Sequence, residues 1–121
     1  MGNAYEIICK EIEKSPKNIK LVEQFEQRFK DAGLFDELIK LYQMALVQNE
    51  DVEYFEKIAD LYNECGNYEE AVNYYLNYCE STEATPEIYY KLAEVFEKNN
   101  DIQSKNSCLE FAKKLEEKHG N

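Results

Sequence analysis

The sequence has no tryptophan, a single histidine, four glycines, two prolines and no long apolar run. The chain is 44% apolar and 32% charged. Together with the low content of glycine and proline, this composition favours a helical, soluble protein over a disordered one. No apolar stretch approaches the length of a membrane span. The amino end, MGNAYEIICKEIE, lacks the basic and apolar regions of a signal peptide. We therefore expect a cytoplasmic protein.

Groups that could perform catalysis are also scarce. The one histidine, His119, lies close to the carboxyl end, where we expect the polar tail to fray and to offer no fixed geometry. The sequence contains no G-x-x-x-x-G-K, G-x-G-x-x-G or H-E-x-x-H motif. Asn99, Asn100 and Asp101 lack the acidic spacing and the glycine of a calcium loop and indicate a helix cap instead. We expect a protein that is not an enzyme and needs no cofactor or metal.

The four cysteines are far apart in the sequence and form no C-x-x-C pair, which argues against a zinc or redox motif. Each falls on or beside an apolar stripe, so we expect small buried hydrophobic residues, with a reactive or disulfide-forming role as the alternative. They are Cys9, Cys65, Cys79 and Cys108.

Negative charge is concentrated in the second half of the chain. Residues 51–112 hold fourteen Asp and Glu but only four Lys and Arg, within a whole-chain formal charge of −11. Such a field repels the phosphates of nucleic acids and of anionic membranes. It attracts basic ligands, so a basic protein or peptide is the expected partner.

Residues 52–80 predict two amphipathic helices with a glycine between them. Apolar residues recur at spacings of three and four on both sides of Gly66. A glycine between two such stripes fits a helix end, where the chain turns through positive φ. The stripes are Phe55, Ile58, Ala59 and Tyr62 before the glycine, and Tyr68, Ala71, Val72, Tyr75 and Tyr78 after it.

This helical hairpin resembles a tetratricopeptide repeat. The form A-x-x-Y-x-x-x-G-N-Y-x-E-A-x-x-Y-Y is matched from Ala59 through Gly66 to Tyr75, and related patterns recur 33 residues upstream and 34 downstream. Asn100 takes the place of Gly66 in the downstream copy, because asparagine tolerates the left-handed conformation. The resemblance implies an all-α, right-handed α-solenoid of antiparallel helix pairs in one domain, 1–121. We divide it into a half repeat (3–16) and three repeats (18–50, 52–84 and 86–118).

The predicted solenoid has about seven helices. Small residues at Ala59 and Ala71 predict a close approach of the two helices of the middle repeat, which larger side chains would prevent. The first copy has Glu26 and Leu38 at these positions, and the third has Lys105 in place of Ala71. The expected helices are 4–14, 18–31, 35–48, 52–65, 68–80, 86–99 and 101–118.

The first helix of each repeat lines the concave surface in this family, which holds peptides there. The face turned away from the packing stripe is mostly acidic here, and the lysine and asparagine clamp with which some family members hold a peptide carboxylate is absent. We hypothesise that it binds a basic segment, with Tyr90 as an aromatic contact; a solvated face is the alternative. Its candidate residues are Glu23, Gln27, Glu53, Glu56, Asp60, Asn63, Glu87, Tyr90, Glu94 and Glu97.

A second hypothesis treats the chain as an assembly module. A repeat stack that begins without a polar cap exposes an apolar patch, and Ile7 and Ile8 would form it here. The chain would then associate with itself or stack within a longer array. We expect a monomer in the first case and a weak homodimer in the second.

Overall fold

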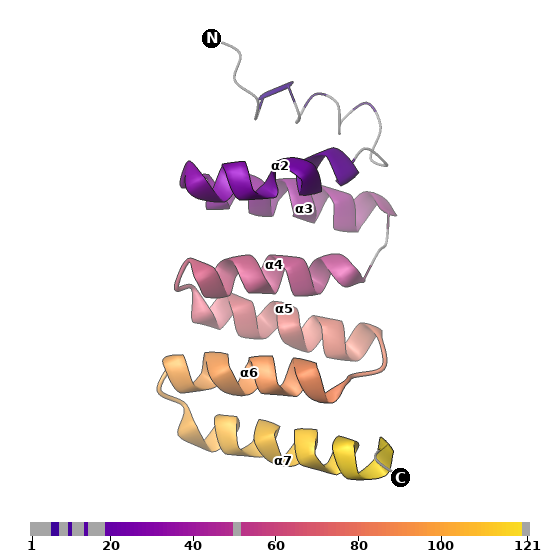
Figure 1. The fold of residues 1–121 in the computed structure, drawn as a ribbon, viewed down its shortest axis with the longest axis vertical. Coiled ribbons are helices and arrows are strands. Elements are labelled where there is room, and N and C mark those ends of the chain that lie inside the picture. The colour runs from indigo at the N-terminus through magenta and orange to yellow at the C-terminus, as the bar shows by residue number, and fades with distance from the viewer. Residues whose placement is uncertain (1–5, 8–9, 11–13, 15–18, 50–51, 120–121) are drawn as a thin grey trace. The chain divides into compact units, whose positions relative to one another are not determined.

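The computed structural model describes residues 6–7, 10, 14, 19–49 and 52–119. The predicted all-α class is confirmed, because the described residues form helices and turns but no strand. Each predicted helix from the second onward matches within one residue at either end. The helices are α2 (Ile19–Asp31), α3 (Phe35–Asn49), α4 (Glu53–Glu64), α5 (Tyr68–Ser81), α6 (Pro86–Lys98) and α7 (Ile102–His119), as labelled in Figure 1.

The predicted helix over residues 4–14 lies mostly outside the described residues. Its described positions, Glu6, Ile7, Lys10 and Lys14, are helical. At the other end, α7 continues to His119, and the expected fraying of the polar tail stays a prediction.

The chain divides into two compact units, residues 1–58 and 59–121. The boundary falls within α4, after Ile58. Compact units follow packing and need not end where repeats end, so the predicted repeat boundaries stay a prediction. The two units are described separately below.

Three turns share the left-handed residue that the sequence pattern predicts. Gly33 has φ +74° and Gly66 has φ +84°. Asn100 has φ +63°, and no other described residue except these two glycines has positive φ. Asparagine therefore performs the role of glycine in the third turn, as predicted.

The residue after each left-handed position closes one helix and begins the next. The N–H groups of Leu34, Asn67 and Asp101 donate to the carbonyls of Phe29, Tyr62 and Phe96, at 2.8–2.9 Å. The carbonyls of the same three residues accept from the N–H four positions later, at 3.1 Å. This is the Schellman arrangement, followed directly by the first turn of a new helix.

In the first unit, α2 packs against α3. The core is mostly aliphatic, with two tyrosines buried in it. Burial of these apolar side chains is the main force that holds the helices together. The core residues are Phe29, Leu38, Ile39, Leu41, Tyr42, Ala45, Tyr54 and Ile58.

In the second unit, α6 packs against both α5 and α7 (Figure 1). Ala59 and Ala71 are fully buried in one hydrophobic cluster, and the predicted close approach of their two helices stays a prediction. Tyr62 and Tyr78 pack against this cluster as predicted. Its buried members are Ala59, Ala71, Tyr75, Ile88, Leu92, Ala93, Val95 and Cys108.

The cysteine prediction is correct in part. Cys108 is buried and Cys79 is half-buried, and burial raises the pKa of both thiols. Cys65 is exposed, because it belongs to the turn that precedes Gly66 and lies beyond the end of α4. All three are free thiols, and Cys9 lies outside the described residues.

Candidate functional site

Four of the predicted binding residues lie along one side of α6, at spacings of three and four residues. Glu87, Tyr90, Glu94 and Glu97 are all exposed, and we call them the α6 face. Helical periodicity places residues at these spacings together. The sequence prediction therefore brings these four side chains to one surface of the second unit.

Two carboxylates of the α6 face already have a nearby lysine. Lys98 Nζ lies 3.1 Å from Glu94 Oε1, and Lys105 Nζ lies 3.3 Å from Glu97 Oε2. The carboxylate side chains stay more than half exposed, at 60% and 57%. Lys105 replaces the small Ala71 of the middle repeat, and its long side chain extends so that the ammonium pairs with Glu97.

Tyr90 is 40% exposed, so part of its ring faces solvent. Its hydroxyl donates a hydrogen bond of 2.6 Å to Glu116 Oε1 on α7. This bond is the main reason that the pKa of Tyr90 is raised. The ring is therefore held in position from α7 while one side remains available for contact.

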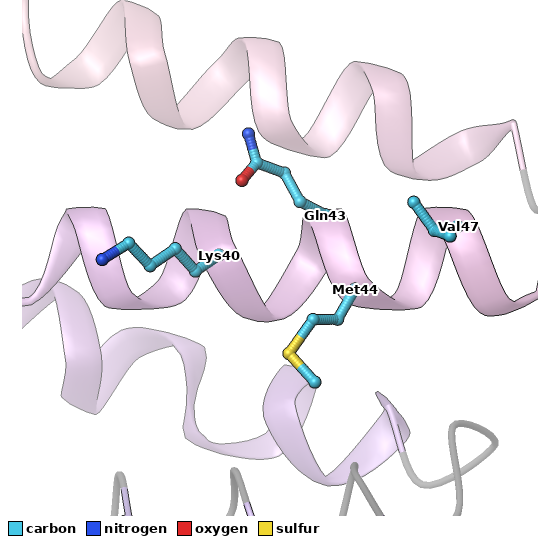
Figure 2. A pocket seen from close by; sticks show the side chains of 4 residues that line it. All are labelled: Lys40, Gln43, Met44 and Val47. Carbon is cyan, nitrogen blue, oxygen red and sulfur yellow. The ribbon is translucent and has the colours of Figure 1, made fainter.

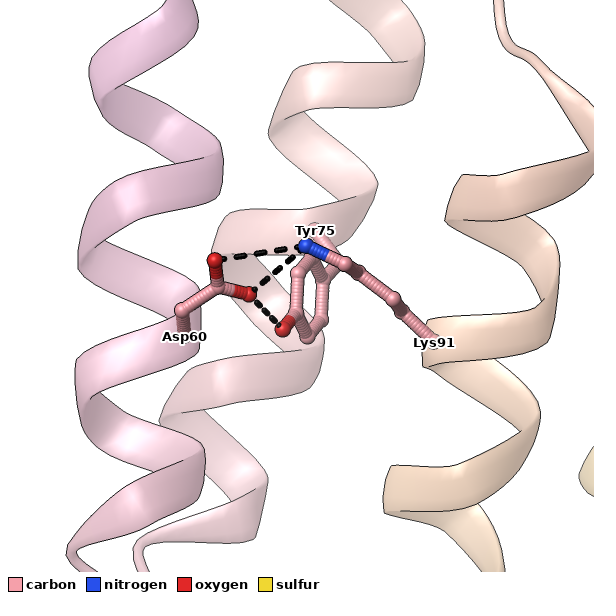
Figure 3. A network of polar contacts seen from close by, with 3 residues as sticks. All are labelled: Asp60, Tyr75 and Lys91. Atoms are coloured by element: carbon pink, nitrogen blue, oxygen red, sulfur yellow. Dashed lines mark hydrogen bonds and ion pairs between the residues drawn. The ribbon is translucent and has the colours of Figure 1, made fainter.

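Asp60 joins three successive helices. Figure 3 shows the Asp60 carboxylate on α4 joined by dashed lines to the hydroxyl of Tyr75 on α5 and to the ammonium of Lys91 on α6. Tyr75 donates to Asp60 Oδ1, and Lys91 Nζ lies 3.2 and 3.3 Å from the two carboxylate oxygens. Tyr75 is buried, whereas the side chains of Asp60 and Lys91 are 40% and 39% exposed. The network therefore begins in the core and ends at the surface.

Asn63, one turn after Asp60, is half-buried. Its side-chain Oδ1 is buried and has no hydrogen-bond partner within the described part of the chain. A buried oxygen without a partner costs stability.

The predicted binding residues of the first unit are also engaged. Glu23 Oε1 accepts a hydrogen bond of 3.1 Å from the Tyr54 hydroxyl and lies 4.0 Å from Lys57 Nζ. Gln27 donates to Asp31 Oδ1 over 2.9 Å. Glu53 is exposed and Glu56 is half-buried, both on α4.

The sequence analysis omitted two lysines from this surface. Lys57 and Lys91 lie 34 residues apart, and each pairs with a carboxylate of the preceding first helix, Glu23 and Asp60 respectively. Their recurrence at the repeat period was the signal that could have identified them. Because these cations intervene, the carboxylates are less mutually repulsive than their sequence pattern suggests.

Two buried tyrosines bond to carboxylates across a helix pair. Tyr42 donates to Glu26 Oε1 at 2.7 Å, as Tyr75 does to Asp60 in the next pair. Burial, followed by the bond to Glu26, strongly raises the pKa of Tyr42. Glu26, which replaces the small Ala59 of the middle repeat, thus satisfies the hydroxyl of a buried ring.

A shallow hollow of about 490 Å³ lies on one side of α3 (Figure 2). Its lining is mostly apolar, and Val47 is 75% exposed. The four lining side chains recur at spacings of three and four on this one helix, and none belongs to the predicted site. They are Lys40, Gln43, Met44 and Val47.

None of the described helices combines the length and hydrophobicity that a membrane span requires. Among the described residues, no group of three or more His, Cys, Asp or Glu is arranged to hold a metal ion.

Residues 59–100 match the family model of the TPR repeat. This chain contains a TPR repeat. The match covers about a third of the sequence, from the second half of α4 to the left-handed Asn100, and lies within the second unit. TPR repeats usually mediate binding between proteins and are generally non-catalytic. No curated protein matches the chain.

Proposed function

We propose that this TPR protein is a non-catalytic module that binds a basic segment of another protein along the α6 face. The observation that carries the proposal is the exposure of Glu87, Glu94 and Glu97 together with Tyr90 on one side of a helix inside the matched repeat. Three carboxylates and an aromatic ring are the groups that favour Lys and Arg side chains.

The ion pairs on the α6 face do not prevent it from binding a basic ligand. Exposed pairs such as Glu94 with Lys98 contribute only about 0–1 kcal/mol, so a ligand cation can replace the lysine at small cost. The acidic charge of the chain would also speed the approach of a basic ligand. Tyr90, held by Glu116, offers a ring already in position, which limits the entropy lost on binding.

The test is titration of a fluorescent, Lys- and Arg-rich peptide followed by anisotropy. A triple variant with Glu87→Gln, Glu94→Gln and Glu97→Gln should bind at least about tenfold more weakly, because charge-assisted contacts are lost. A matched variant with Glu80→Gln, Glu83→Gln and Glu110→Gln removes the same charge from exposed positions outside the α6 face. It should bind nearly as well as the wild type.

Equal weakening of the two triple variants would show that only total charge matters and would end the proposal of a site on α6. Failure of the wild type to bind any basic peptide at low salt would refute the basic ligand itself. Circular dichroism of each variant separates loss of binding from loss of helix.

Self-association is the second candidate, and one observation favours it. Ile7 is 59% exposed, and isoleucine at a helical position with this exposure suits a contact between copies. Light scattering over a range of concentrations should then detect a weak dimer that Ile7→Glu abolishes. A monomer at all concentrations would remove this candidate. Ile8, its predicted companion, lies outside the described residues.

A further inference from the structure

The Asp60 carboxylate is held in one orientation by a residue of the core. Tyr75 is 1% exposed and donates its hydroxyl proton to Oδ1, so the carboxylate cannot turn without breaking this hydrogen bond to the core. Lys91 Nζ reaches both carboxylate oxygens from α6. Asp60 is therefore a prepositioned acceptor that is already occupied by a cation of the same chain.

Lys91 competes with any ligand cation for this carboxylate. The lysine is tethered to the adjacent helix, which gives it a high effective concentration at Asp60. A ligand lysine would exchange one ammonium for another and would gain little. A guanidinium can donate two parallel N–H bonds from separate nitrogens to the two oxygens of one carboxylate, whereas both contacts of the Lys91 ammonium come from a single nitrogen.

From this geometry we infer that the Asp60 carboxylate, oriented by Tyr75, selects arginine over lysine, and that Lys91 is a resident cation that lowers the affinity for both. The inference rests on the proposed function and adds to it the chemical class of the ligand side chain. An arginine displaces the Lys91 ammonium, which moves into solvent from a position where it is already 39% exposed. Lys91 acts on the affinity through Asp60, whereas Asp60 contacts the ligand.

The first experiment compares two peptides of equal length and charge, one with arginine and one with lysine at every basic position. The wild type should bind the arginine peptide about three- to tenfold more tightly, since the bidentate geometry of a guanidinium with a carboxylate adds both energy and geometric specificity. Equal binding of the two peptides would overturn the inference and leave the proposed function intact. Binding of neither peptide would refute the proposed function.

The second experiment removes the Lys91 ammonium from Asp60. Lys91→Gln should raise the affinity for both peptides about two- to fivefold, which is the range of an exposed ion pair, and should leave the preference for arginine unchanged. Lys91→Arg keeps a cation at Asp60, and its guanidinium can bind the carboxylate through two parallel N–H bonds. This variant should therefore lower the affinity for both peptides. A merely structural role for Lys91 would instead predict weaker binding for Lys91→Gln and rescue by Lys91→Arg.

Two controls identify the cause of the gain. Lys113→Gln removes the same charge from an exposed position on α7, so a gain as large as that of Lys91→Gln would mean that overall charge is responsible and would overturn the inference. Asp60→Asn keeps an acceptor for Tyr75 but removes the carboxylate charge. In that background Lys91→Gln should change affinity less than about 1.5-fold, because the coupling between the two side chains is gone; a full gain would contradict the assignment of Asp60.

Discussion

Tyrosine at two buried positions has a purpose that phenylalanine could not serve. Tyr42 and Tyr75 are both almost fully buried, yet each hydroxyl bonds to a half-buried carboxylate of the partner helix, Glu26 and Asp60. The ring contributes apolar packing, and the hydroxyl connects that packing to the polar surface. This pairing gives a physical reason for tyrosine at these two of the ten tyrosine positions.

Asp101 provides a residue-scale prediction that depends on pH. Its carboxylate accepts hydrogen bonds from the hydroxyl and the backbone N–H of Ser104, and these bonds lower its pKa. A depressed pKa means that the folded state is stabilised above the unfolded-state pKa of about 3.9 and loses this stabilisation as the pH falls through the lower folded-state value. Asp101→Ala should therefore lower the melting temperature at pH 7, and the difference from wild type should shrink below pH 4.

The control is Glu110→Ala, which removes an exposed carboxylate from the interior of the same helix α7. It should change the melting temperature at pH 7 much less, because alanine is a good helix former and no cap is lost. A deficit for Asp101→Ala that stayed constant from pH 7 to pH 3 would show that its charge does not contribute.

At the scale of the element, the three turns are one structural device used repeatedly. Gly66 has φ +84°, and a Cβ added there would meet no atom within 4 Å, so only the backbone conformation resists substitution. We predict that Gly66→Ala lowers the free energy of unfolding by about 1–2 kcal/mol. Gly66→Asn should cost clearly less, because asparagine already occupies the equivalent left-handed position at residue 100.

Urea unfolding monitored by circular dichroism measures both variants. Asn67→Ala serves as a comparison at the next residue, where it removes the side chain that accepts from the Glu70 N–H but leaves the left-handed glycine. If Gly66→Ala and Gly66→Asn were equally destabilised, the cost would not come from the left-handed conformation.

Helix positions could be predicted because their signals are local. Spacings of three and four residues located the stripes, and Gly33, Gly66 and Asn100 marked the helix ends through a conformation that few residues adopt. Ala71 and Leu38 show what such signals leave open. Both positions are fully buried, one with a small and one with a large side chain, so each pair of helices accommodates its own contact in a way that periodicity does not specify.

The candidate site was predictable in part for a related reason. The exposed positions of the α6 face follow from helical geometry alone. The pairing of Lys91 with Asp60 does not follow from helical geometry. The two residues are 31 positions apart in sequence and lie on different helices, so their pairing depends on how the helices pack. The 34-residue spacing of Lys57 and Lys91 can be seen in the sequence. Which carboxylates they pair with can be seen only in the structure.

At the scale of the whole molecule, burial is uneven among the helices of the second unit. Four residues of α6 are buried, Ile88, Leu92, Ala93 and Val95, since it packs against helices on two sides. The longer α7 contributes only Cys108 and Ala112 to the buried set. Local stability follows such differences in packing.

Hydrogen exchange measured by mass spectrometry should therefore find the slowest amides of this unit in α6 and faster exchange in α7. The comparison is internal, because peptides from both helices come from the same sample and the same pH. Protection in α7 that equalled that of α6 would contradict the prediction and would point to a covering surface that the described residues do not supply.

In each turn within a helix pair, one residue is hydrogen-bonded to both helices. Leu34, Asn67 and Asp101 each use the N–H for the helix behind and the carbonyl for the helix ahead, so adding even one residue there would uncouple both ends. The connection from Thr82 to Thr85 between α5 and α6 is longer and is not helical. Any extra sequence, such as a reporter tag or an epitope inserted by design, therefore belongs in that connection.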